Sequence, residues 1–179
     1  KAMWEKICIG FATTEKDTGV KDFFMKQLQL IGGNLSVEAM KVCLGSKELC
    51  DPALAVIAAA GGPAAEKILA ESLNIKDLPC AAAVMNTLAL MNSEIAVNEY
   101  ITWAASADIN VKASAFNALA RSGSQSAYPV LSDAARNAFY GWEQTGATAS
   151  LLNYANSVGR KGDIKTLDKI CKLIICFKL

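Results

Sequence analysis

The chain has 179 residues, of which 53% are hydrophobic, 7% aromatic and 20% charged. Lys and Arg number 18 and Asp and Glu 17, so the formal net charge is +1, and His is absent. The near balance of charge argues against a non-specific nucleic-acid binder, and the lack of His removes the commonest general base and metal ligand. No stretch approaches the roughly twenty apolar residues of a membrane-spanning helix. The high Ala content and the lack of alternating apolar and polar residues favour packed helices over a sheet.

Helical periodicity begins at the start of the chain. Apolar residues three and four positions apart predict an amphipathic helix over residues 1–12, and a polar link over 13–19 follows it. The next predicted helix covers residues 20–30. Ser36 is the predicted cap of its partner, which runs to about Leu44.

The next two helix pairs are marked by proline and by capping residues. Pro52 falls in the first turn of a helix over residues 49–60, and Pro63 opens its partner, which ends near Leu73. Pro79 opens the following pair. Ser93 is the predicted cap of its second helix, which carries Tyr100 and Trp103.

The last predicted helices follow two aspartates. Asp108 is the expected cap of a helix that ends near Leu119, and Gln125 or Ser126 precedes a partner that reaches about Asn137. Two more helices are predicted over residues 147–158 and 164–177, the second of them capped by Asp163.

Three aromatic residues interrupt the regular pattern at Phe139, Tyr140 and Trp142, around Gly141. They either fill a gap between two helix pairs or form an exposed contact. We favour the first interpretation, because aromatic side chains are usually buried.

A turn between the two helices of a pair recurs along the chain. The turn residues are Gly32, Gly61, Asn92, Gly123 and Gly159, which are 29, 31, 31 and 36 positions apart. Gly, and Asn at some cost, accept the left-handed conformation that ends a helix, so this conformation is expected at each turn. Residues four positions before and eight after each turn are large or apolar, and we expect these two columns to pack against each other. The columns are Leu28, Ile57, Leu88, Leu119 and Ala155, and Met40, Leu69, Tyr100, Leu131 and Leu167.

A period near thirty with helices on both sides of a turn is typical of an α-solenoid. We therefore predict an all-α fold, a right-handed α–α superhelix of about five helix pairs forming a single repeat domain over residues 1–179. The pairs are expected at residues 20–46, 49–73, 79–106, 109–137 and 145–177. Because the chain begins with Lys and residues 173–177 are apolar almost all round, we expect it to be a fragment of a longer protein.

Six cysteines are present, and none of them form a CxxC pair, which makes a zinc or redox site unexpected. Cys43, Cys80 and Cys171 fall on apolar columns, so we interpret them as small buried residues. A bridge between Cys43 and Cys50 across an inter-repeat loop is an open alternative. Free thiols favour a reducing compartment. We predict no catalytic, metal-binding or cofactor-binding residues.

The repeat resembles HEAT repeats, specifically the short bacterial type first noticed in phycobilisome-lyase proteins, whose core reads roughly A-L-x-x-I-G-D-P-x-A-V-P-x-L. Residues 31–40 and 122–131 match that pattern best, although the Asp after the Gly is absent and the usual turn Pro occurs only as Pro63. The chain also resembles exported multi-repeat proteins of gut-type bacteria, in which such repeats accompany sugar-active domains. This second likeness favours an exported location, so the compartment is left open.

The resemblance implies a scaffold that binds another protein along the ridge of second helices. The lack of a convergent chemical constellation, the near balance of charge and the lack of a long apolar stretch predict no catalysis, no nucleic-acid partner and no membrane-spanning segment. Nine residues are the expected partner contacts, seven of them on the ridge and two in the aromatic segment. They are Lys41, Lys67, Glu71, Asn98, Thr102, Asp133, Arg136, Tyr140 and Trp142.

Three alternatives remain open. One is an accessory repeat domain of a larger exported carbohydrate-active protein. Another is a lyase-like or chaperone enzyme, for which Cys50 and Cys80 are the only candidate nucleophiles. The third is excision of a DNA base by Trp103 and Asp108, and it is disfavoured because Trp103 lies on the apolar side of its helix.

Overall fold

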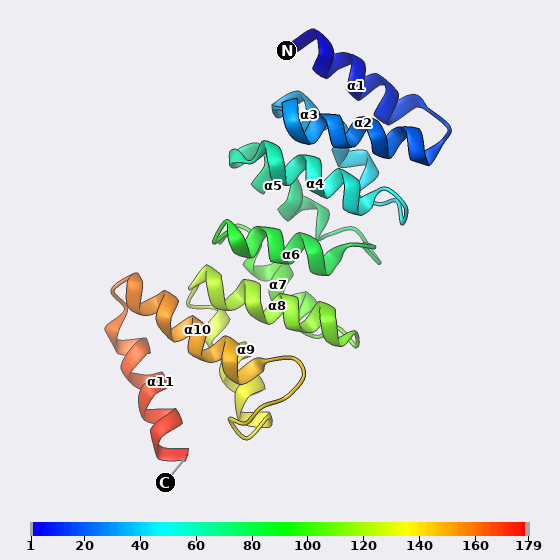
Figure 1. The fold of residues 1–179 in the computed structure, drawn as a ribbon. Helices are drawn as coiled ribbons and strands as arrows, with labels where there is room; N and C mark the ends of the chain where they lie inside the picture. The colour runs from blue at the N-terminus through cyan, green and yellow to red at the C-terminus, as the bar shows by residue number, and fades with distance from the viewer. Residues whose placement is uncertain (1, 178–179) are drawn as a thin grey trace. The chain divides into compact units, whose positions relative to one another are not determined.

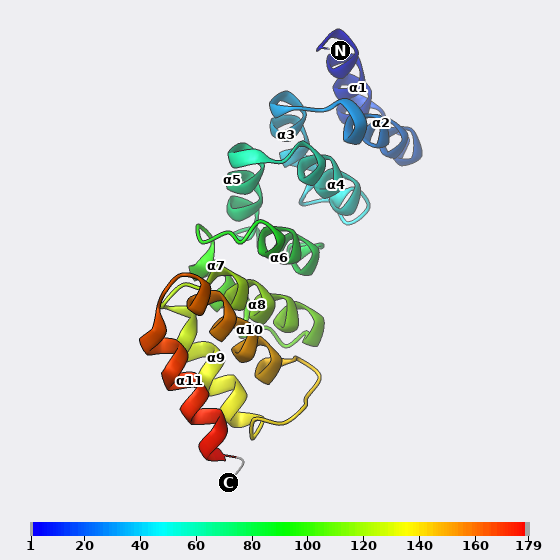
Figure 2. The ribbon, with the colours of Figure 1, turned by 60° about the vertical axis from the view of Figure 1, so that its left-hand side comes forward.

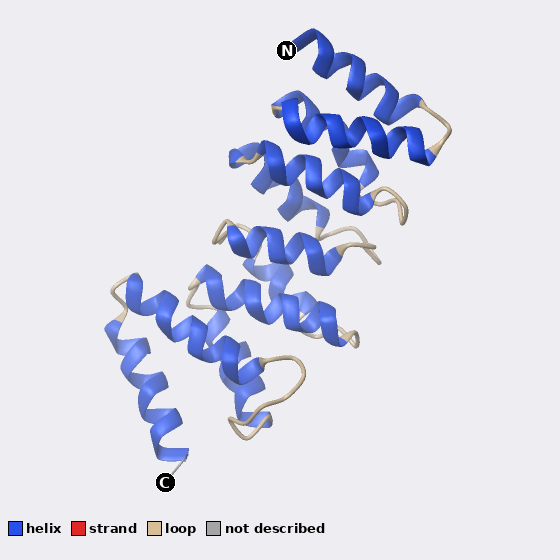
Figure 3. Ribbon diagram, viewed as in Figure 1, coloured by secondary structure: helices blue, strands red, loops and turns tan. Residues whose placement is uncertain are grey.

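The computed structural model describes residues 2–177, with side chains as far as Ile175. Within these residues the chain forms eleven α-helices and one short 3₁₀ helix, and no strand (Figure 3). The all-α prediction is therefore confirmed. The chain divides into two compact units, residues 1–84 and 85–179. Helix α6 (Ala81–Leu90) runs across the division.

The first unit is built from α1 (Ala2–Thr14), α2 (Thr18–Ile31), α3 (Asn34–Met40), the 3₁₀ helix η1 (Lys41–Cys43), α4 (Cys50–Ala60) and α5 (Gly62–Ser72). Helix α2 packs on α1 and on α4, whereas α3 packs on α4 and on α5. Figure 1 shows the two layers that result, with α2 and α4 side by side in front of α3 and α5.

The second unit contains α7 (Val97–Trp103), α8 (Ile109–Ser122), α9 (Ala127–Asn137), α10 (Ala147–Arg160) and α11 (Ile164–Phe177). Helix α7 packs on α8, and α10 contacts α8, α9 and α11 (Figure 2). These helix bounds lie within a few residues of the predicted ones.

Both predicted packing columns are buried. All five residues four positions before the turns are buried, and so are the residues eight positions after the first four turns. Leu167, in the fifth repeat, is half-buried. The columns are therefore buried in both units with the exception of Leu167, and burying a large apolar side chain stabilises a fold by about 1.5–3 kcal/mol relative to its exposure.

The predicted turn conformation holds at three of the five positions. Gly61, Asn92 and Gly123 have φ of 64°, 53° and 58°. The prediction is wrong at Gly159, because α10 continues through it and the left-handed residue is Gly162, with φ of 84°. It is also wrong at Gly32, whose φ is −63°. Position 32 accepts only Gly for a steric reason, because an added Cβ atom would lie 2.5 Å from the Leu28 carbonyl oxygen.

Aspartates begin several helices. Asp108 accepts hydrogen bonds from Asn110 N and Val111 N, and Asp163 accepts one from Thr166 N, which confirms both predicted caps. Asp17 caps α2 in the same way and was not predicted.

The predictions of Ser36 and Ser93 as helix caps are wrong. Ser36 lies inside α3, which begins at Asn34 with Gly33 as its N-cap residue, and the buried Ser36 hydroxyl donates to Glu5 of α1. The N-cap residue of α7 is Ala96, and Ser93 lies buried in the preceding turn.

Candidate partner-binding surfaces

Three of the predicted ridge residues form one exposed cluster in the first unit. Lys41 Nζ lies 2.6 Å from Glu71 Oε2, and Lys67 Nζ lies 3.9 Å from Glu71 Oε1. The hydrogen bond from Lys41 lowers the pKa of Glu71, and the same bond raises the pKa of Lys41. The two lysines share one carboxylate, so Lys67 is the less satisfied cation of this cluster.

The other four ridge residues belong to the second unit and also interact locally. The Thr102 hydroxyl donates to the Asn98 carbonyl oxygen within α7, and Arg136 pairs with Asp133 across 3.2 Å within α9. All four side chains are exposed. Exposed ion pairs of this kind contribute little to stability, so these groups remain open to a partner.

The aromatic segment lies in the loop between α9 and α10. Phe139 and Tyr140 adopt left-handed φ of 52° and 49°, which is uncommon for bulky residues. Their amides donate to the carbonyl oxygens of Arg136 and Ala135, and these bonds hold the turn.

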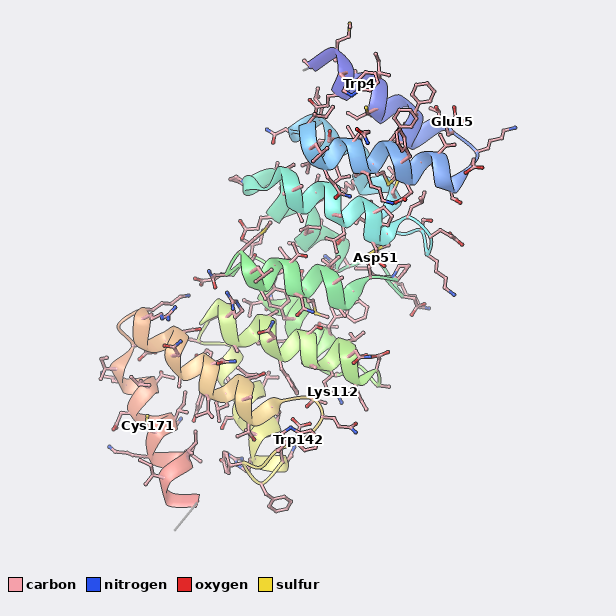
Figure 4. The ribbon with its side chains drawn as sticks, viewed as in Figure 1. Trp4, Glu15, Asp51, Lys112, Trp142 and Cys171 are labelled. Carbon is pink, nitrogen blue, oxygen red and sulfur yellow. A yellow bond between two sulfur atoms is a disulfide. The ribbon has the colours of Figure 1, made fainter. Side chains whose placement is uncertain are left out.

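The loop divides its aromatic side chains between the interior and solvent. Tyr140 is 8% exposed, whereas Phe139 and Trp142 are 76% and 89% exposed. The prediction of Tyr140 as a surface contact is wrong because its ring packs inward. The filling interpretation holds for Tyr140 and is wrong for the other two, which project into solvent; Figure 4 shows Trp142 on this loop.

An open pocket of about 570 Å³ lies beside this loop, within the second unit. Its apolar wall comes from α7, α8 and α9, including Ile101, Phe116 and Val130. Five of its lining residues are alanines, and their short side chains leave the hollow open. They are Ala104, Ala105, Ala134, Ala138 and Ala147. The volume falls in the range of small-ligand and peptide side-chain sites.

Glu143 lines the pocket, and its carboxylate accepts three hydrogen bonds from neighbouring residues of the chain. One carboxylate oxygen accepts from Thr145 N and Thr145 Oγ1, and the other accepts from Ala147 N at the start of α10. Burial raises the pKa of Glu143, but these hydrogen bonds and the charge of Lys112 outweigh it, so the pKa is lowered. Glu143 is therefore an ionised structural group.

Lys112 of α8 also lines the pocket and is half-buried. Among the described residues, no hydrogen bond or ion pair engages its ammonium group. Figure 4 shows Lys112 and Trp142 at the same end of the second unit. Sequence reasoning missed Lys112, Glu143 and the pocket, because these residues meet only through the folding of three helices and a loop.

The cysteines differ from the predictions. Cys50 and Cys80 form a disulfide, with Cα atoms 5.9 Å apart, so Cys50 does not pair with Cys43. A disulfide persists in oxidising compartments, which removes two thiols from the argument for a reducing one. Cys43 and Cys8 are buried thiols, and burial raises the pKa of both. Cys171 is exposed on α11, so its predicted burial is wrong.

The other candidate chemical groups have structural roles. The carboxylate of Asp108 accepts the capping hydrogen bonds of α8, and Trp103 is half-buried in α7. Within residues 2–177, no group of three Cys, Asp or Glu side chains is arranged to hold a metal ion. None of the described helices combines the length and the apolar character that a membrane crossing needs.

Neither a scan against protein-family models nor a search of curated proteins finds a match for this chain. The resemblance to HEAT repeats therefore rests on the residues quoted above.

Proposed function

We propose that the chain is a HEAT-like repeat scaffold, a right-handed α–α solenoid of about five helix pairs, which binds another protein and catalyses no reaction. The observation that carries the proposal is a regular sequence separation between residues in contact. In a stack of repeats, equivalent positions of neighbouring repeats meet, so contacts recur at one repeat length.

Most of the long-range side-chain contacts in both units follow this rule, whereas Asn86 with Ser114 and Lys161 with Ser122 are 28 and 39 positions apart. Six side-chain contacts join residues that are 30 to 32 positions apart, close to the spacing of the turns. They are Glu5 with Ser36, Lys41 with Glu71, Cys50 with Cys80, Asn86 with Asn117, Ala89 with Arg121, and Ser124 with Tyr154. A bundle without repeats gives no reason for this shared separation.

The polar groups that come together in the described residues also favour a scaffold over an enzyme. Asp17, Asp108 and Glu143 cap helices, and Lys161 donates to the Ser122 carbonyl oxygen at the end of α8. The disulfide leaves Cys50 and Cys80 with no thiol for lyase-like chemistry. These side chains either cap a helix or hold neighbouring segments together.

A second candidate function is an accessory repeat domain of a larger exported carbohydrate-active protein. The Cys50–Cys80 disulfide favours it, because such bonds are typical of exported proteins.

The scaffold function is tested by affinity capture from the source organism, with each captured protein then purified and titrated against the chain. A matched pair of variants tests the ridge: Lys67→Glu with Arg136→Glu, and Lys16→Glu as a control for charge reversal at another exposed lysine. We expect the ridge variant to bind a partner more weakly and the control to bind it as the native chain does. The proposal is overturned if no purified protein binds the native chain directly.

A further inference from the structure

We propose that the pocket beside the α9–α10 loop binds an acidic peptide segment, with an apolar side chain in the pocket and a carboxylate on Lys112. This inference rests on the proposed scaffold function and specifies the chemistry of its partner. It concerns the second unit alone and does not use the ridge residues.

The shape of the pocket selects an apolar group. Ile101, Phe116 and Val130 line it, and the alanines listed above leave a volume of about 570 Å³. Leu- or Phe-sized groups fit such a space, and their burial is favourable because it removes apolar surface from water.

Of the two charged groups that line the pocket, Lys112 is the one with no hydrogen bond or ion pair among the described residues. Glu143 already accepts three hydrogen bonds from the chain, so its carboxylate has little capacity for a basic ligand. Lys112 is half-buried and interacts with Glu143 only through its charge, which lowers the pKa of that carboxylate. A carboxylate near Lys112 would therefore gain a charge-assisted hydrogen bond in partly desolvated surroundings.

The loop favours a peptide over a small free acid. Trp142 and Phe139 lie outside the pocket and are 89% and 76% exposed. The hydrogen bonds to Glu143 on one side and the left-handed turn on the other fix the loop that carries them. Exposed aromatics beside a pocket are the anchors typical of protein interfaces, and only a ligand that extends past the pocket reaches them.

The test uses an array of ten-residue peptides, each carrying one Leu or Phe flanked by Asp and Glu. Matched arrays replace the acidic residues by Lys, or the apolar residue by Ser. The best binder is then titrated against the native chain by fluorescence anisotropy. We expect acidic peptides with an apolar residue to bind and both matched sets to fail.

Variants locate the binding. Lys112→Glu should weaken binding about 10- to 100-fold, the range expected for loss of a charged hydrogen bond. Arg160→Glu reverses an exposed charge elsewhere in the second unit and should leave the affinity unchanged. Ala105→Leu adds bulk at an exposed residue of the pocket lining and should also weaken binding, and its circular dichroism spectrum and unfolding temperature check that it folds as the native chain does.

Several outcomes overturn the inference. Equal binding of acidic and basic peptides would do so, as would equal losses in Lys112→Glu and Arg160→Glu. Binding of 4-phenylbutyrate without binding of any peptide would assign the pocket to a small acid. If captured partners bind Lys112→Glu as tightly as the native chain, the scaffold function stands and this inference fails.

Discussion

The carboxylate of Glu5 in α1 accepts a hydrogen bond of 2.8 Å from the hydroxyl of Ser36 in α3. The same oxygen accepts a second bond of 2.8 Å from the amide of Gly33, the N-cap residue of α3. Glu5 is 8% exposed, so water competes little for these donors. A side chain of one helix thus supplies the N-terminal cap of another.

Replacing Glu5 should destabilise the first unit. Glu5→Ala leaves the Ser36 hydroxyl and the Gly33 amide without this acceptor, and a cost of about 1–3 kcal/mol is expected. Glu5→Gln keeps one acceptor oxygen and should cost less. Urea unfolding followed by circular dichroism measures the difference. Glu15→Ala, at the other end of α1, is the control, and an equal loss there would contradict the capping role.

Alanine should have opposite effects at two glycines. Gly32→Ala places a Cβ atom 2.5 Å from the Leu28 carbonyl oxygen, so a loss of about 1–3 kcal/mol is expected from overpacking. Gly10 lies inside α1 with nothing within 4 Å of an added Cβ, and Gly10→Ala should stabilise the helix by about 0.5–1 kcal/mol. Thermal unfolding of both variants checks the signs, and stabilisation by Gly32→Ala would contradict the close turn.

Loss of the Cys50–Cys80 disulfide, which joins residues 30 positions apart, should lower the stability of the chain by about 3.6 kcal/mol, the value expected for a closed loop of this size. Unfolding with and without dithiothreitol measures it. The double variant Cys50→Ser, Cys80→Ser should be less stable and insensitive to the reductant. Labelling of native protein with iodoacetamide before reduction should modify Cys171, and modification of Cys50 would argue against the bond.

Glu143 should make the loop between α9 and α10 sensitive to acid. Its folded-state pKa is lowered, so its contribution to stability is present above the unfolded value of about 4.3 and is lost as the pH falls through the folded value. Glu143→Gln places an amide nitrogen against one of the donors and should remove this contribution. The stability difference between native and variant should be largest near neutral pH and shrink below about pH 4. A difference that stays constant down to pH 2 would contradict the assignment.

Local signals predicted much of the fold. The columns around the turns are set by helical periodicity, and burial follows from it in nearly every repeat. Asp108 and Asp163 were predicted as caps because an N-cap acts within three residues of itself. Ser36 was misassigned because its partner, Glu5, is 31 positions away and no local pattern indicates it.

Longer-range features carried weaker signals. Cys50 and Cys80 are one repeat apart, at corresponding points of successive repeats, and that spacing could have indicated their pairing. The exposure of Trp142 and the burial of Tyr140 depend on the left-handed conformation of Phe139 and Tyr140. Neither residue is a glycine, so the sequence does not indicate this conformation. The pocket needs three helices and a loop at once, so it becomes visible only in the folded unit.

Small-angle X-ray scattering of the monomeric chain, with its mass checked by light scattering, tests the repeat architecture most directly. A compact globule of 179 residues has a radius of gyration of about 16 Å. The proposed solenoid would stack its helix pairs about 8–10 Å apart along one axis, and for it we expect a clearly larger radius and a maximum dimension of roughly 60 Å. A monomer with a radius near 16 Å and an isotropic profile would contradict the stacked-repeat scaffold.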